Sequence, residues 1–187
     1  MNKKVIIGVA GMPGAGKATL RSAAESMGLP VVIMGDEIRD ETERRGMEPT
    51  LENIGRVMLM LRDEEGPATI AKRCIPKIEA SNSEVVFVDG LRSLHEVDEF
   101  KKRYTHNLVA VHSSPEARFQ RLFKRKRSDD PKSWDDFYQR DLRELSVGQG
   151  SVIALADYMI VNEGSYDDFK VRTSETLVAV VKKWKKK

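Results

Sequence analysis

Three glycines followed by a lysine form the segment whose residue types and spacing point most directly to chemistry. Gly11, Gly14, Gly16 and Lys17 fit the pattern G-x-x-x-x-G-K, directly after an apolar run and at the start of a stretch with helical character. Glycines allow successive backbone N–H groups to curve around a phosphate, and the helix adds the positive end of its dipole. The lysine ammonium adds a full charge beside terminal phosphates. The segment therefore predicts a polyphosphate site, and a chance glycine turn is the alternative.

The predicted binding loop consists of Gly11, Met12, Pro13, Gly14, Ala15, Gly16, Lys17, Ala18 and Thr19. A serine or threonine usually follows the lysine of such a loop and binds Mg²⁺ through its hydroxyl. Ala18 has no hydroxyl, so Mg²⁺ has to be held by phosphate oxygens, waters and carboxylates, with Thr19 as a further candidate. The missing hydroxyl also favours a different class of protein, an ATP-binding switch or slow ATPase that acts through a protein partner.

Two aspartates follow apolar runs that are typical of buried strands. Asp36 closes the run that begins at residues 30–34 (PVVIM), and Asp89 ends residues 84–89 (EVVFVD). A carboxylate at the end of a strand beside the glycine loop can orient Mg²⁺ and its waters. Asp36 could also take the proton from a hydroxyl acceptor. For both residues, capping of the next helix is the alternative.

Two arginines follow these aspartates and are candidates for binding an acceptor. Arg39 lies one helical turn after Asp36, and Arg92 lies three residues after Asp89. The guanidinium group presents a fork of donors that matches phosphate oxygens. A surface ion pair between Asp36 and Arg39, or a solvated Arg92, is the alternative.

A strongly basic helix is predicted over residues 115–127, since six of the ten residues 118–127 are basic. Arg118, Arg121 and Arg125 recur on one helical face, while Phe119 and its neighbours supply an apolar face. This geometry suits a lid whose guanidinium groups reach the transferring phosphates on closure. Arg121 and Arg125 are the favoured catalytic candidates. A solvated helix paired with acidic residues in 129–136 is the alternative.

The surrounding pattern alternates strands and helices, which predicts a three-layer α/β fold with a parallel sheet of about five strands. The 187 residues suit one domain of the P-loop NTPase type. Two stretches exceed a simple crossover, an acceptor-side helical insertion at 48–80 and a basic lid-like insertion at 118–145. Pro67 is predicted in the first turn of a helix, and Pro76 is predicted to kink or end it. The predicted strands cover 3–10, 30–34, 84–89, 107–112 and 158–162, and the predicted helices cover 17–27, 36–45, 51–62, 67–78, 94–103, 115–127, 134–145 and 166–184.

Composition argues against several other classes of protein. The net charge of +3 does not by itself favour a nucleic-acid partner, and we interpret the five lysines of residues 182–187 as a solvated tail. Nucleic-acid binding through residues 118–127 and this tail is the alternative, and it predicts an affinity that falls steeply with salt. The single cysteine, Cys74, rules out a disulfide within the chain and is expected to be a buried thiol. No apolar run approaches the roughly 20 residues of a membrane helix. A cytoplasmic protein without a membrane partner is expected, and the sequence does not indicate its oligomeric state.

Several ordered motifs resemble those of known kinases. GMPGAGKAT is similar to the loop of adenylate kinases, Gly35–Arg39 (GDEIR) to their G-D-x-x-R element, and Asp89–Arg92 (DGLR) to their D-G-x-x-R element, one residue shorter. Residues 156–165 resemble the A-D-x-x-I-x-N-x-G-S segment of dephospho-CoA kinases. Over essentially its full length the chain most resembles an archaeal group of adenylate-kinase-related P-loop proteins, similar to nucleoside monophosphate kinases and dephospho-CoA kinase.

This resemblance implies ATP and Mg²⁺ as cofactors, acceptor binding by Arg39 and Arg92, and a place for Asn162 beside the donor adenine. We therefore expect a kinase that transfers the γ-phosphoryl group of ATP to a small nucleotide-like acceptor. A nucleoside monophosphate is favoured, because Arg39 suits an acceptor phosphate. A hydroxyl acceptor like that of dephospho-CoA stays open, because the resemblance does not name the acceptor.

Overall fold

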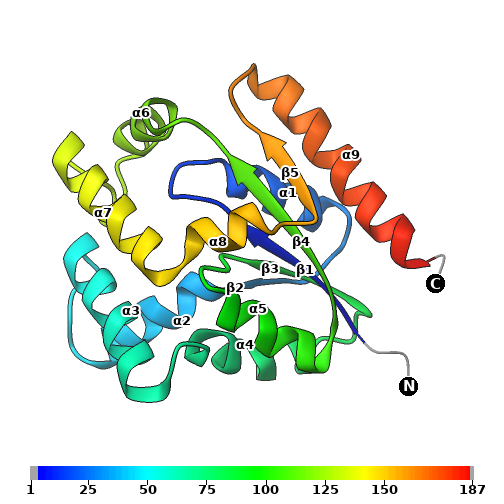
Figure 1. Cartoon of the computed structure of the whole chain (residues 1–187), viewed down its shortest axis with the longest axis horizontal. Coiled ribbons are helices and arrows are strands. Elements are labelled where there is room, and N and C mark those ends of the chain that lie inside the picture. Colours follow the sequence, from blue (N-terminus) through cyan, green and yellow to red (C-terminus); the bar gives the residue numbers. More distant parts are fainter. Residues whose placement is uncertain (1–3, 186–187) are drawn as a thin grey trace.

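The computed structural model describes residues 4–185, which form one α/β unit (Figure 1). Its elements in chain order are β1 (Val5–Ala10), α1 (Lys17–Ser26), β2 (Val31–Ile33), α2 (Met34–Arg44), α3 (Leu51–Glu65), α4 (Thr69–Ala80), β3 (Val85–Asp89), α5 (Leu94–Arg103), β4 (Thr105–His112), α6 (Pro115–Arg125), α7 (Trp134–Val147), α8 (Gln149–Ala154), β5 (Tyr158–Val161) and α9 (Tyr166–Lys185). The predicted alternation of strands and helices is confirmed.

The five strands form one all-parallel sheet in the order β2-β3-β1-β4-β5. β1 lies in the centre, and each of its six residues is buried. A central strand covered on both faces requires a continuous apolar run, and VIIGVA supplies one. The parallel arrangement brings the end of β1, where the glycine loop begins, beside Asp89 at the end of β3.

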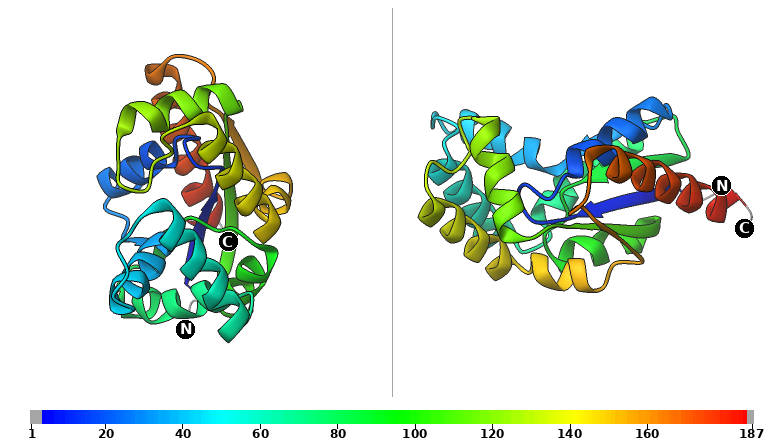
Figure 2. Two further views of the ribbon diagram at one scale, coloured as in Figure 1. Left: turned by 90° about the vertical axis from the view of Figure 1, so that its left-hand side faces the viewer. Right: turned by 90° about the horizontal axis from the view of Figure 1, so that it is seen from above.

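Alternate residues of β1 enter two separate cores on the two faces of the sheet. Val5, Ile7 and Val9 pack with apolar residues of α1 and α9. Ile6 and Ala10 pack on the opposite face with residues of α2, α3, α4, α5 and α8. Figure 2 shows the resulting three layers, with α1 and α9 above the sheet and α5 and α8 below it in the right-hand view.

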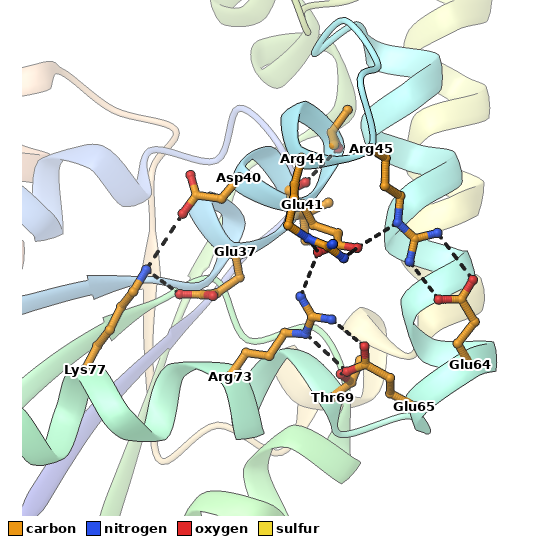
Figure 3. Close-up of polar contacts among 12 residues, drawn as sticks. Glu37, Asp40, Glu41, Arg44, Arg45, Glu64, Glu65, Thr69, Arg73 and Lys77 are labelled. Carbon is orange, nitrogen blue, oxygen red and sulfur yellow. Dashed lines mark hydrogen bonds and ion pairs between the residues drawn. The ribbon is translucent and has the colours of Figure 1, made fainter.

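The helices of the acceptor-side insertion are fastened to α2 by a cluster of ion pairs around a buried glutamate (Figure 3). Glu41 of α2 accepts hydrogen bonds from Arg44 of the same helix, from Arg45 at its C-cap and from Arg73 of α4. Arg45 also pairs with Glu64 of α3 at 2.7 Å. These contacts hold α2, α3 and α4 together beside the carboxyl ends of the strands, where a ligand cleft of this fold lies.

The structure differs from the sequence prediction at four places. Helix α8 was not predicted, because Gly148 and Gly150 interrupt the pattern and Gly148 ends α7 in a left-handed conformation. Pro67 precedes α4 by two residues, so its predicted first-turn position is wrong. Pro76 lies inside α4, which continues to Ala80, so Pro76 does not end the helix, and the kink that was the other possibility stays a prediction.

The fourth difference concerns the element that carries Asp36. Helix α2 begins at Met34, so Asp36 lies in its first turn and not at the end of strand β2. Asp36 does not cap α2 either, since Ile33 holds the cap position. The predicted positions of Lys3 and of the last two lysines, Lys186 and Lys187, lie outside the described residues.

Two smaller features also bear on the sequence analysis. Cys74 is buried, and burial raises the pKa of its thiol to about 12, which makes it the inert core residue that we expected. Within residues 4–185, no helix combines the length and the apolar character needed to cross a membrane. Trp184, inside the predicted lysine tail, is partly buried against the core on the α1 and α9 side.

Candidate functional site

The glycine loop adopts a backbone that only glycine tolerates. Gly14 and Gly16 have φ values of 82° and 113°, in the left-handed region. A Cβ at Gly16 would lie 2.5 Å from Nδ2 of Asn162, and one at Gly14 would lie 2.7 Å from the carbonyl oxygen of Arg118. The loop therefore curves tightly into the N-terminus of α1, which begins at Lys17, as anion binding by backbone N–H groups requires.

The side chain of Lys17 bonds to the backbone of its own loop. Its Nζ donates a hydrogen bond of 2.5 Å to the carbonyl oxygen of Gly11. Burial lowers the pKa of Lys17 to about 8, while the negative charge of Asp89 opposes that shift. A lysine that is poorly solvated and only partly neutralised attracts an incoming anion strongly, because an anion replaces the hydration that Lys17 lacks.

A cleft of about 330 Å³ opens beside this loop at the carboxyl edge of the sheet. Eight of its lining side chains are basic and three are acidic, so the cleft favours an anionic ligand. The basic residues are Lys17, Arg21, Arg39, Arg92, Arg121, Arg125, Arg127 and Arg140, and the acidic residues are Asp36, Asp89 and Asp129. The size and charge together match a site for phosphate groups.

Asp89 presents a buried carboxylate oxygen with no protein partner. Its Oδ1 accepts no hydrogen bond from any of residues 4–185, and its Oδ2 lies 3.9 Å from Nη1 of Arg21. A buried polar atom without a partner is costly unless a ligand or water satisfies it. Mg²⁺ with its water shell fits this position, because a hydrated cation donates the hydrogen bonds that Oδ1 lacks.

The other predicted metal ligands are arranged less favourably. Asp36 lines the cleft, but Thr19 is not among the lining residues, whereas the exposed Ala18 is. No cluster of three or more His, Cys, Asp or Glu side chains suited to a metal ion occurs in the described part of the chain. Protein ligation of a metal at this site therefore centres on Asp89 with Asp36, and the phosphates and waters must supply the remaining ligands.

Both predicted acceptor arginines line the cleft. Arg39 donates to Asp36 at 3.0 Å and lies 3.5 Å from Asp129. Arg92 forms an ion pair of 2.8 Å with the buried Glu144 of α7, which fixes its position at the wall of the cleft. The ion pair between Asp36 and Arg39 that we considered is present, and both side chains remain partly exposed to the cleft.

The basic helix α6 is docked against the glycine loop. Leu122 is buried, and a Cβ at Gly14 would lie 3.0 Å from its Cγ. Phe119 packs on Trp134 and Phe137 of α7, as its predicted apolar face required. Phe123, by contrast, is half exposed.

The three arginines of α6 have different surroundings. Arg118 is buried, binds Asp141 and the carbonyl oxygen of Pro13, and does not line the cleft. Arg121 lines the cleft and donates to Ser113 at 2.7 Å. Arg125 lines the cleft and forms two hydrogen bonds with Asp130. Only the last two therefore remain in position to face a phosphoryl group.

Two amide side chains support the glycine loop through hydrogen bonds to its carbonyl oxygens. Asn162 donates from Nδ2 to the carbonyl oxygen of Ala15 at 2.9 Å, and it is buried rather than lining the cleft. Gln149 donates from Nε2 to the carbonyl oxygen of Gly11 at 2.7 Å. The predicted contact of Asn162 with adenine stays a prediction.

Sequence reasoning missed three residues of this site. Gln149 was missed because the short helix α8 was not recognised. Arg21 and Asp129 line the cleft, and Arg21 lies one turn after Lys17 on α1, a spacing that could have identified it. Asp129 lies in the loop between α6 and α7, where spacing gives no such signal.

Curated relatives match almost the whole chain. The chain is 51% identical over 174 residues to a UPF0200 protein from Hyperthermus butylicus, covering 93% of this chain and 94% of that protein. It is 48% identical over 166 residues to one from Methanocaldococcus jannaschii, with 88% and 84% covered. A third, from Pyrococcus furiosus, is 47% identical over 182 residues, with 95% and 97% covered. The chain belongs to the UPF0200 family.

Members of wider groups share the fold of this UPF0200 chain. Residues 10–138 match the family model described as an AAA domain. TT1252 from Thermus thermophilus superposes with a TM-score of 0.65 at 19% identity, covering 95% of this chain and 98% of that one. Shikimate kinase from Acinetobacter baumannii, solved in complex with shikimate, gives 0.58 at 18% identity, with 97% and 95% covered. The predicted P-loop kinase-like fold is confirmed, as is the archaeal family resemblance.

Proposed function

We propose that this UPF0200 protein is an ATP-dependent phosphotransferase that passes the γ-phosphoryl group to a small phosphorylated acceptor, with a nucleoside monophosphate favoured. One observation carries the proposal. The ammonium of Lys17 and the unpartnered oxygen of Asp89 line the same cleft as the guanidinium groups of Arg39 and Arg92. Such a cleft can take a donor polyphosphate at one end and an acceptor anion at the other.

The donor side follows from the loop geometry. Backbone N–H groups of the loop and the N-terminus of α1 bind the phosphates, and Lys17 transfers its hydrogen bond from Gly11 to them. Mg²⁺, when bound, offsets charge on the phosphate oxygens. Asp89 would hold such a hydrated metal through Oδ1. Arg121 and Arg125 face the transferring group, where guanidinium groups offset its negative charge.

The acceptor side favours a substrate that already carries a phosphate. Arg39 and Arg92 supply two guanidinium groups to the lining of the cleft, and Arg140 adds a third. A phosphate held there presents an anionic oxygen that needs no general base. A hydroxyl acceptor instead requires Asp36 to take a proton, and Asp36 already accepts a hydrogen bond from Arg39.

Transfer of labelled γ-phosphate from ATP to a pooled library of nucleoside monophosphates, dephospho-CoA and shikimate tests this proposal. Labelling of a monophosphate is the expected result, and Lys17→Ala should abolish it. Lys101→Ala, which alters an exposed lysine at the other end of the sheet, serves as the matched control. Labelling that persists undiminished in Lys17→Ala would falsify the assigned site.

An ATP-binding switch or slow ATPase is the second candidate, and Ala18 is the observation that favours it. Ala18 is exposed at the cleft and offers no hydroxyl to a metal. Poor metal binding would slow turnover while nucleotide binding by the loop remained. ATP hydrolysis at one rate with and without every acceptor in the library supports this candidate over the kinase.

A further inference from the structure

Four arginines line a small hollow of about 30 Å³ that adjoins the main cleft, and one of them is unpaired. Three of them face carboxylates. Arg39 lies beside Asp36 and Asp129, and Arg92 pairs with Glu144. Arg140 lies 3.5 Å from Asp129. The guanidinium of Arg143 forms no hydrogen bond or ion pair with any residue between 4 and 185. A partly buried guanidinium without a partner is an available donor group for a ligand.

The position of Arg143 is set by a glycine on the facing helix. A Cβ at Gly55 of α3 would lie 2.5 Å from Cζ of Arg143, 2.6 Å from Nη1 and 2.8 Å from Nε. The guanidinium therefore lies directly against the backbone of α3, where any side chain at Gly55 would displace it. Glycine inside a helix costs roughly 1 kcal/mol relative to alanine. Helix α3 is therefore less stable with Gly55 than with alanine, and the glycine leaves room for the guanidinium of Arg143.

Arg143 also borders a second and larger hollow. This hollow of about 420 Å³ lies between the start of α3 and the α7 side of the lid-like insertion. Leu51 and Arg143 line both hollows, so they form the boundary between them. Its remaining lining residues are Thr50, Glu52, Ser128, Asp130, Lys132, Asp136 and Gln139.

The spacing along α7 relates this hollow to the acceptor phosphate. Arg140 and Arg143 are three residues apart, so their side chains share one face of the helix. A ligand whose phosphate binds at Arg39, Arg92 and Arg140 can extend its other end past Leu51 to Arg143. The acceptor side of the cleft can therefore hold a ligand longer than a phosphate attached to one small ring.

We propose that Arg143 recognises the base of a nucleoside monophosphate acceptor and selects a 6-oxopurine over adenine. The inference rests on the proposed function and names its substrate class. The guanidinium carries only donors, arranged as a fork. The O6 and N7 atoms of guanine or hypoxanthine are neighbouring acceptors that match this fork, whereas adenine places an amino donor at position 6.

Calorimetric titration with GMP, IMP and AMP in the absence of ATP tests the inference without requiring turnover. The wild type should bind GMP and IMP about tenfold more tightly than AMP. Arg143→Lys keeps the charge but loses the fork, so it should weaken GMP and IMP binding about tenfold and leave AMP within about twofold. Gly55→Ala should reproduce this result, because it displaces the guanidinium while favouring the helix.

Arg172→Lys on the exposed surface of α9 is the matched control and should change none of the affinities. Equal weakening of all three nucleotides in Arg143→Lys overturns the inference, since Arg143 would then bind phosphate. The inference is also overturned if none of the three nucleotides binds while ATP still binds in a manner that requires Lys17. Selective GMP binding without phosphoryl transfer leaves the inference standing and contradicts the kinase activity instead.

Discussion

Arg118 and Asp141 form a buried pair that joins the lid-like insertion to the glycine loop. The two hydrogen bonds from the guanidinium to the carboxylate measure 2.8 and 2.6 Å, and Nη1 also donates to the carbonyl oxygen of Pro13 at 3.2 Å. The guanidinium lies 4.9 Å from the ring centre of Phe137. Helices α6 and α7 are thereby fixed to the loop in this conformation, so α6 forms a wall of the cleft.

Removing Asp141 should destabilise the protein because Arg118 would remain buried without a counter-charge. We expect Asp141→Asn to lower the free energy of unfolding by about 3 kcal/mol. The double variant Arg118→Met with Asp141→Leu should recover much of that loss, since no buried charge remains. Urea denaturation monitored by circular dichroism measures both effects. A loss below about 0.5 kcal/mol in Asp141→Asn would show that the pair is not important for stability.

Sequence reasoning located the loop and the strand-end carboxylate because both depend on local order along the chain. Gly11 to Lys17 follow a strand directly, and Asp89 ends one, so a parallel sheet has to bring them together. The role of Arg118 depended instead on Asp141, a residue 23 positions away whose helix had to be placed first. Helical periodicity grouped Arg118 with Arg121 and Arg125 but could not show that the side chain of Arg118 is buried.

The glutamine that braces the loop should influence ATP affinity. The carbonyl oxygen of Gly11 accepts hydrogen bonds from both Lys17 and Gln149. When Lys17 moves to a phosphate, Gln149 keeps that buried carbonyl satisfied. In Gln149→Ala the move would leave the carbonyl without a partner, at a cost of about 1–3 kcal/mol.

We therefore expect Gln149→Ala to weaken ATP binding by about tenfold, measured by titration with a fluorescent ATP analogue. Gln120→Ala, on the exposed side of α6 where the side chain of Gln120 donates to Glu116, is the matched control. Unchanged ATP affinity in Gln149→Ala would mean that Lys17 does not leave Gly11 on binding.

Restoring a hydroxyl after the loop lysine should strengthen metal-dependent activity. Ala18 is exposed at the cleft, so a serine fits there without displacing a neighbour. The added oxygen would supply the hydroxyl ligand to Mg²⁺ that Ala18 does not offer, in addition to Asp89 and Asp36. Ala18→Ser should lower the Mg²⁺ concentration for half-maximal ATP turnover severalfold, and Ala18→Val should not. An identical Mg²⁺ requirement in both variants would argue against a metal beside residue 18.

The ion-pair cluster around Glu41 should make stability depend on acid pH. Hydrogen bonds from Arg44 and Arg45 lower the pKa of Glu41 to about 2 from 4.5, and Arg73 adds to the effect. Because the folded-state pKa is depressed, the stabilisation is complete above pH 4.5 and is lost as the pH falls toward 2. A shift of this size corresponds to a contribution of about 3 kcal/mol at neutral pH.

Glu41→Gln removes this contribution and leaves three arginines without their shared carboxylate (Figure 3). We expect the variant to be about 2–3 kcal/mol less stable than the wild type at pH 7, with a deficit that shrinks to about 1 kcal/mol at pH 2.5. Urea denaturation at both pH values measures the difference. Glu43→Gln alters an exposed glutamate on the same helix and should match the wild type at both. A deficit in Glu41→Gln that stays constant with pH would show that packing, rather than the carboxylate charge, holds α2 against α3 and α4.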